Sequence, residues 1–181
     1  SIKALVRSPE KVSLMDDNLH LVQGDVLDIG SVEMTVAACD IVVSLFGQVK
    51  DSPEWLQTQG TKNTVAAMKK NGLEKIISLS GGGLPFPEKD EPQFADKMIR
   101  FIMKLMVPKI LNDAIAHHQV LAESGLKWMI VRGPRLTNDP KKGSYRVGWV
   151  GVNGSTKIGR ADLADFILKQ VESDKYLYPM P

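Results

Sequence analysis

Cysteine is nearly absent from the sequence, since Cys39 is the only one in 181 residues. A lone thiol cannot form a disulfide within the chain, and in an apolar-alternating stretch it is typical of a small buried side chain. A reducing compartment, the cytoplasm, is therefore the expected location. Long hydrophobic runs are missing too. No stretch approaches the roughly 20 apolar residues of a membrane-spanning helix, and the opening residues show no signal-peptide pattern.

A strong excess of either charge is also lacking, because 23 Lys and Arg face 21 Asp and Glu and leave a net charge of +2. So small a charge gives no reason to expect nucleic acid or a membrane as a partner, and we expect a small-molecule substrate. No metal site is expected either. The adjacent pair His117-His118 lacks the i, i+4 spacing of ligands on a helix, and no second cluster accompanies it.

What is present suits one globular domain over residues 1–181, with 43% hydrophobic residues. Short apolar segments alternate with segments of helical spacing, which indicates parallel strands joined by right-handed crossovers. The predicted fold is an α/β, doubly wound parallel-sheet Rossmann fold. Strands are expected at residues 2–7, 19–22, 40–47, 74–80 and 127–132, and helices from near Ser31, at 55–71, at 94–124 with a break at Pro108, and at 160–171.

Two segments depart from this alternation. Residues 143–152 are expected to form an extended hairpin with glycines at its turns. Residues 94–108 combine methionine-rich apolar spacing with lysines and an arginine. Core packing is the favoured interpretation of this segment, and a pocket lid or a contact between subunits is the alternative. A basic amphipathic helix could also touch a membrane surface, but the weak overall charge of the chain argues against this role.

In doubly wound sheets, ligands bind beyond the carboxyl ends of the strands. The predicted strand ends carry five groups of residues, which are Arg7, residues 24–25, residues 46–47, residues 80–83 and residues 132–136. A binding site is expected among them.

Several of these segments also resemble a known family. Residues 24–28 (GDVLD), 61–68 (TKNTVAAM), 124–128 (SGLKW) and 159–166 (GRADLADF) are similar to the NAD(P)H-binding, NmrA-like atypical short-chain dehydrogenase/reductases, nearest to the flavin reductase/biliverdin reductase B type. The resemblance runs in the correct order over nearly the whole chain. It implies a Rossmann fold and a dinucleotide cofactor, and it leaves the substrate open.

The family normally begins with a strand, a glycine-rich loop and a helix before the strand that matches residues 2–7. That loop brings backbone amides and a helix N-terminus to the pyrophosphate. We expect a preceding segment of roughly 20 to 30 residues, the front of a βαβ unit. A fragment that does not bind dinucleotide is the alternative. The cluster Gly81-Gly82-Gly83 follows a later strand and is not taken for this loop.

The resemblance places Arg7 beside the 2′-position of the adenosine ribose. Arginine can form paired hydrogen bonds with a 2′-phosphate, so the expected cofactor is NADP, with NAD possible. Lys11 could add a second positive charge. The alternative is that both residues are simply solvated side chains on the surface.

Other cofactor contacts also follow from the family pattern. Asp25 and Val26 are expected beside the adenine, unless Asp25 only caps a turn. Gly47, with its neighbours Phe46 and Gln48, is expected beside the ribose. Leu79, Ser80, Gly133 and Pro134 are expected at the nicotinamide end, where Gly133 replaces a family proline.

Ser80, His117 and His118 are the candidate catalytic residues. Ordinary short-chain dehydrogenases pair such a serine with Tyr-x-x-x-Lys, in which lysine helps tyrosine to move a proton. Here those positions fall near Ile110 and Ala114, so a tyrosine-driven mechanism is not expected. A histidine could donate the proton instead, but adjacent helical residues point about 100° apart and at most one of the pair can face a pocket. Arg135 is either a contact for an anionic substrate or a solvated loop residue.

These residues support an NADP-dependent reductase that transfers hydride to a small planar acceptor such as a flavin or quinone. A non-enzymatic dinucleotide sensor of the NmrA type explains the same pattern. A sugar-nucleotide epimerase or dehydratase is a third reading, weakened by the missing tyrosine. The protein is expected to be a monomer or homodimer.

Overall fold

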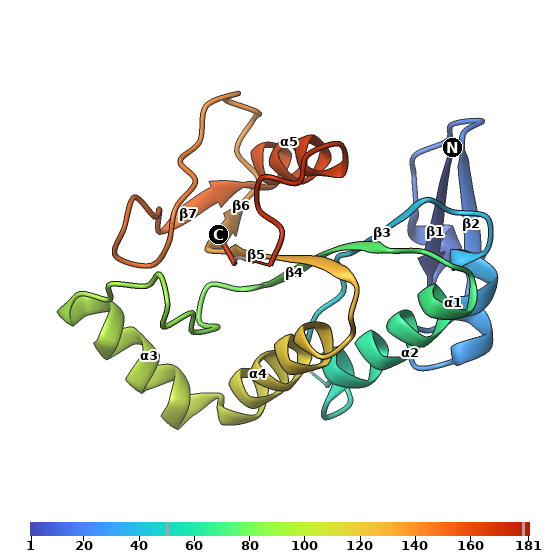
Figure 1. Cartoon of the computed structure of the whole chain (residues 1–181). Coiled ribbons are helices and arrows are strands. Elements are labelled where there is room, and N and C mark those ends of the chain that lie inside the picture. The colour runs from blue at the N-terminus through green and yellow to red at the C-terminus, as the bar shows by residue number, and fades with distance from the viewer. Residues whose placement is uncertain (50, 179) are drawn as a thin grey trace.

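The computed structural model describes residues 1–49, 51–178 and 180–181. Its strands and helices alternate over most of the chain, as Figure 1 shows. The strands are β1 (Ile2–Val6), β2 (Leu19–Gln23), β3 (Ile41–Ser44), β4 (Lys75–Gly81), β5 (Lys127–Gly133), β6 (Arg135–Thr137) and β7 (Lys157–Gly159). The helices are the short 3-10 helix η1 (Pro9–Lys11) and the α-helices α1 (Ile29–Val36), α2 (Leu56–Lys70), α3 (Phe94–Met106), α4 (Pro108–Ala122) and α5 (Arg160–Val171).

Every strand pair in this part of the chain is parallel. The strands form three groups, in the orders β1-β2, β3-β4-β5 and β6-β7. In the central group, Ile76 pairs with Val42 on one side and Trp128 on the other. The predicted mixed α/β architecture with a parallel sheet is confirmed.

Helices cover both faces of the central strands. Ile76, Trp128 and Ile130 belong to one buried apolar cluster, which α1, α2 and α4 complete. Their neighbours Ile77 and Met129 belong to a second cluster, with Leu163 and Phe166 of α5. Successive residues of a strand point to opposite faces. In Figure 1, α5 therefore lies on one side of β4 and β5, and α2 and α4 lie on the other.

The pair β1-β2 forms no ladder with the central strands in the part of the chain that the structure describes. Figure 1 shows this pair beside α1, to one side of β3. Its connection to the rest of the molecule runs through helices, because α1 contacts both β1 and α2. The edges of β1 and β3 that do not face β2 and β4 carry no described strand partner.

The extended hairpin expected at residues 143–152 is wrong. This segment is irregular, with only isolated bridges from Trp149 to Val152 and Asn153. Its backbone groups bond elsewhere, since Val150 accepts from the amide of Glu91 at 2.9 Å and donates to Asp90 at 3.2 Å. Contacts distant in sequence therefore replace the local pairing of a hairpin.

The core-packing interpretation of residues 94–108 is also wrong. None of the residues of α3 is buried, although the expected break at Pro108 is present, where α4 begins. No described helix is long and apolar enough to cross a membrane.

Candidate functional site

A cleft of about 990 Å³ opens at the carboxyl ends of β4 and β5. It is enclosed by the strand ends themselves, the inner side of α3, the irregular chain before β7, the strands β6 and β7, and the start of α5. From the strand ends, the lining residues are Gly81, Gly82, Gly83, Gly133, Pro134 and Arg135. The position agrees with the general rule for ligands of doubly wound sheets.

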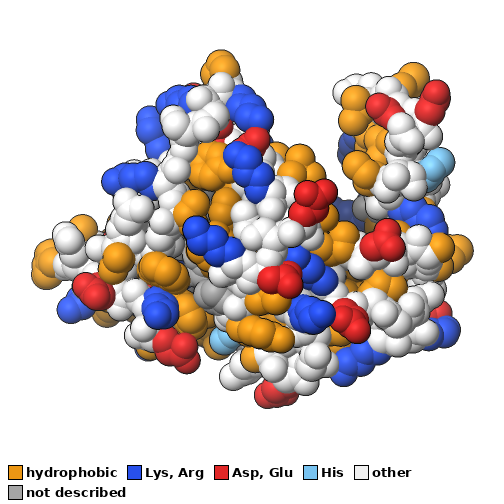
Figure 2. Space-filling model, turned by 45° about the horizontal axis from the view of Figure 1, so that its top comes forward, with side chains coloured by type: hydrophobic (Ala, Val, Ile, Leu, Met, Phe, Trp, Pro, Cys, Tyr) orange, Lys and Arg blue, Asp and Glu red, His pale blue; other side chains and the backbone are white. Residues whose placement is uncertain are grey.

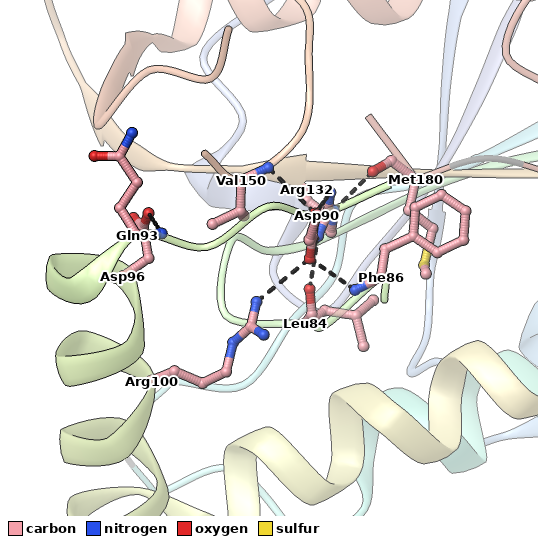
Figure 3. A network of polar contacts seen from close by, with 9 residues as sticks. All are labelled: Leu84, Phe86, Asp90, Gln93, Asp96, Arg100, Arg132, Val150 and Met180. Carbon is pink, nitrogen blue, oxygen red and sulfur yellow. Dashed lines mark hydrogen bonds and ion pairs between the residues drawn. The ribbon is translucent and has the colours of Figure 1, made fainter. Parts of the chain in front are cut away.

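A buried ion pair includes Arg132, one of the residues that line this cleft (Figure 3). Arg132, in β5, donates to both carboxylate oxygens of Asp90, at 2.8 and 2.9 Å. Each of these side chains is only 2% exposed. Arg132 also donates to the carbonyl oxygens of Leu84 at 2.9 Å and Met180 at 2.7 Å.

Asp90 joins further segments to the same network. It accepts from the amide of Phe86 at 2.8 Å and from Arg100 of α3 at 3.4 Å. Burial alone would raise the pKa of this carboxyl, but hydrogen bonds from Arg132 and backbone amides outweigh burial and hold the pKa below its ordinary value. Sequence patterns did not indicate this pair, because its partners lie 42 positions apart.

The residues expected at the nicotinamide end do lie together. The amide of Gly82 donates to the carbonyl of Gly133 at 2.9 Å, and a Cβ added at Gly133 would lie 3.4 Å from Leu79. Pro134 lines the cleft with both glycines. Ser80 is buried immediately before the lining glycines, and its hydroxyl has no hydrogen-bond partner among the described residues.

Two of the residues expected near the adenosine also meet. A Cβ added at Gly60 in α2 would come within 2.7 Å of the Phe46 ring and 2.9 Å of Val26. Only glycine therefore allows α2 to approach these two side chains so closely. Asn63, one helical turn further on, donates to the carbonyl of Val26 at 2.9 Å. Gly47 has open space, since its added Cβ would meet only the Gln57 side chain, at 3.9 Å.

The polar residues expected at this end are less constrained. Arg7 is exposed directly after β1, and Lys11 is exposed at the end of η1. Asp25 accepts from the amide of Leu27 at 2.9 Å, which is the turn-capping arrangement. Their roles at a cofactor remain predictions.

Asp113 is a buried polar centre that sequence reasoning missed. Its carboxylate accepts from the amides of Gln57 and Thr58 at 2.9 Å each, and from the Thr58 hydroxyl at 2.6 Å. It thereby caps the N-terminus of α2 from α4. Gln48 also donates to it, at 2.8 Å. A signal was available, because Asp113 shares the buried face of α4 with Leu121 and His117.

Neither histidine of α4 lines the cleft. His117 is 1% exposed, and its Nε2 lies 2.9 Å from the Ser78 hydroxyl. Burial, the largest influence, lowers the pKa of His117 to about 4, although Asp113 opposes the shift. A neutral imidazole is therefore expected at pH 7. The ring of His118 packs edge-on against Trp128, with 5.4 Å between centroids.

Tyr145 is a cleft residue that the sequence reasoning did not select. Its hydroxyl donates to Asp165 at 2.9 Å and accepts from Lys169 at 3.2 Å. Burial, and then the bond to Asp165, raise the pKa of this phenol although Lys169 opposes the shift. A catalytic Tyr-Lys pair needs the opposite effect, so this cluster does not replace the missing dyad.

The described helix N-termini bear on where a dinucleotide could bind. Asp28 accepts from the amides of Gly30 and Ser31 at the start of α1, and Asp113 fills the start of α2. These two N-termini are therefore not open to a pyrophosphate. The open space at Gly47 and Gly81 and the Ser80 hydroxyl, which has no hydrogen-bond partner among the described residues, suit the sugar and nicotinamide parts of the cofactor.

Comparison with known proteins agrees with this geometry. The model of the NAD(P)H-binding family matches residues 1–174. The chain belongs to this family.

Solved structures show the same fold. An oxidoreductase from Lactococcus lactis is similar with a TM-score of 0.77 and 20% identity, over 99% of this chain and 77% of that chain. A short-chain dehydrogenase/reductase from Veillonella parvula, solved in complex with NADP, has a TM-score of 0.68 and 18% identity, over 91% and 69% of the two chains. An anaerobilin reductase from Escherichia coli O157:H7 has a TM-score of 0.71 and 17% identity, over 94% and 78%.

Proposed function

We propose that this protein is an NADP-dependent reductase that transfers hydride to a small planar acceptor, such as a flavin or quinone, in the cleft. One observation carries the proposal. In a chain of the NAD(P)H-binding family, a cleft of about 990 Å³ opens where the nicotinamide end is expected, at Gly81–Gly83 and Gly133–Pro134.

In this reaction the protein itself positions the nicotinamide and the acceptor and shields them from water. Glycines at the strand ends let two flat rings approach the backbone. The network of Arg132 and Asp90 holds the loop after β4 in place beside the cleft. The nicotinamide, when bound, supplies the hydride. Since neither histidine lines the cleft and the Tyr145 proton is held by Asp165, solvent would supply any proton.

Two further observations support the finer parts of the proposal. Arg7 is exposed at the end of β1, where it could pair with a 2′-phosphate. The structurally similar anaerobilin reductase is named for a reduction, and the similar Veillonella protein was solved with NADP.

Steady-state oxidation of NADPH, followed by absorbance with FMN, riboflavin and menadione as acceptors, tests the proposal. We expect turnover with at least one of them. Gly82→Val should lower kcat/KM for the acceptor by at least about tenfold, because the new side chain enters the cleft beside Pro134. Gly30→Ala, on α1 far from the cleft lining, is the matched control. NADPH binding without turnover on any acceptor would favour the non-enzymatic sensor.

A further inference from the structure

Helix α3 has two apolar faces, and only one of them meets the protein. Ile99 and Met103 line the cleft, and a Cβ added at Gly83 would come within 2.6 Å of the Met103 methyl. The opposite face is a stripe with helical spacing i, i+4, i+7, i+8 and i+11. This outer stripe consists of Phe94 (79% exposed), Met98 (45%), Phe101 (58%), Ile102 (45%) and Leu105 (66%).

Positive charge borders the outer stripe. Lys97 and Lys104, two turns apart, lie about a quarter turn from its centre at 100° per residue. No ion pair joins either lysine to another described residue. Asp96 is engaged in the capping box of α3, and Arg100 turns inward to Asp90. The outward side therefore shows apolar groups and lysines. At the left edge of Figure 2, where α3 begins, hydrophobic side chains lie at the surface.

This charge pattern distinguishes between the possible binding partners of the outer stripe. If α3 of a second copy packed on it in antiparallel orientation about a two-fold axis, the lysine rows would lie on the same edge and face each other. A surface with apolar depth and negative headgroups satisfies both features at once. We propose that the outer stripe of α3 binds an anionic lipid surface, with the helix axis in the membrane plane.

The net charge of +2 over the whole chain gave no reason to expect a membrane. The charge on the surface of α3 differs from that of the whole chain, because the acidic residue of this helix, Asp96, is engaged in its capping box. Resting on the proposed function, this placement has a consequence for the acceptor. The inner face of α3 lines the cleft, so a lipid-borne quinone is the acceptor class that would reach it.

Vesicle co-sedimentation tests the proposal without cofactor or acceptor, so its outcome is independent of the reductase assignment. We expect binding to vesicles of equal phosphatidylglycerol and phosphatidylcholine, weakened by salt, and much weaker binding to phosphatidylcholine alone. The double variant Phe101→Ser/Leu105→Ser should lower the partition coefficient at least about tenfold. Lys97→Glu/Lys104→Glu should lower it by a similar factor.

Matched controls come from other surfaces of the same chain. Leu168→Ser changes an apolar side chain of α5 that is 65% exposed, and Lys62→Glu changes an exposed lysine of α2. Both should bind vesicles as the unmodified protein does. Failure of the unmodified protein to bind anionic vesicles would overturn the proposal, as would equal binding to neutral ones. A dimer in light scattering that the Phe101→Ser/Leu105→Ser variant dissociates would assign the stripe to a second copy instead.

Discussion

At the scale of a single residue, we propose that Arg7 determines the choice between NADP and NAD. Its guanidinium is exposed beyond β1, free to pair with a 2′-phosphate. We predict that Arg7→Glu weakens NADP binding at least about tenfold more than NAD binding, because charge reversal removes a partner and adds repulsion. Calorimetry with both dinucleotides measures the two affinities. Equal losses for NADP and NAD would reject the assignment, and Lys69→Glu, which changes an exposed lysine in the last turn of α2 outside the cleft lining, serves as the control.

His117 should make stability depend on pH. Its pKa in the folded protein is about 4, and an unfolded histidine titrates near 6.5. As the pH falls from 6.5 toward 4, the unfolded state gains a proton that the folded state does not bind. The free energy of unfolding should then drop by about 1.4 kcal/mol per pH unit, or about 3 kcal/mol in all.

Urea denaturation at several pH values measures this drop. His117→Gln should flatten the profile between pH 4 and 6.5, since glutamine does not titrate and could still bond Ser78. His20→Gln removes an exposed ring on β2 and should leave the profile as it is. An unchanged slope in His117→Gln would show that burial of this ring is not the cause.

At the scale of elements, Asp113 joins α4 to the start of α2. Asp113→Ala leaves the buried amides of Gln57 and Thr58 without acceptors, and each buried unsatisfied group costs about 1–3 kcal/mol. We predict a loss of about 3 kcal/mol or more in the free energy of unfolding, measured in urea. The matched variant Asp28→Ala exposes the amides of α1 to water, and it should cost less. Similar losses in both variants would contradict the role of burial.

Element boundaries show what local patterns determine. α5 begins and ends where its sequence predicts, at Arg160 and Val171, and Pro108 starts a new helix as expected. β6 and β7 went unrecognised because each has three residues and they pair across 19 intervening positions. The outward face of α3 was also misread, because local patterns do not show tertiary contacts. Periodicity shows that a helix has an apolar side, and only tertiary contacts decide whether anything covers it.

The residues of the candidate site also fall into two groups, those that sequence patterns could place and those that they could not. Strand-end residues such as Ser80, Gly133 and Pro134 could be placed together because parallel strands end at a common edge. The pair of Arg132 and Asp90 could not, since one partner lies in a proline-rich loop without periodicity. Sequence spacing alone could not show whether His117 is buried or exposed.

At the scale of the whole molecule, the Asp90 carboxylate connects segments that are distant in the sequence. It accepts hydrogen bonds from Arg132, Arg100 and Val150. Asp90→Asn leaves the 2%-exposed Arg132 guanidinium without its counter-charge, so we predict a loss of about 3–5 kcal/mol in the free energy of unfolding. Asp174→Asn breaks a surface pair with Lys75 and should cost under about 1 kcal/mol. Differential scanning calorimetry compares them.

The same substitution should change the response to acid. The pKa of Asp90 is lowered on folding, so its stabilisation is complete above the unfolded value near 3.9 and is lost as the pH falls below it. The Asn variant should therefore lose less stability than the unmodified protein between pH 5 and pH 3. A parallel loss in both proteins would show that Asp90 does not set the acid sensitivity.

The separation of β1-β2 from the central strands matters for how the molecule opens. Arg7 and Asp25 follow the two outlying strands, whereas the cleft lies at the ends of β4 and β5. Because no described strand ladder joins this pair to the central strands and its main contacts are with α1, we predict that this part of the described chain opens at a lower free energy than the core and that its amides exchange with solvent sooner. A dinucleotide that touches both parts would bind only the joined form. Its binding energy would appear as slower hydrogen exchange in β1 and β2, and cofactor affinity would report how often the two parts are together.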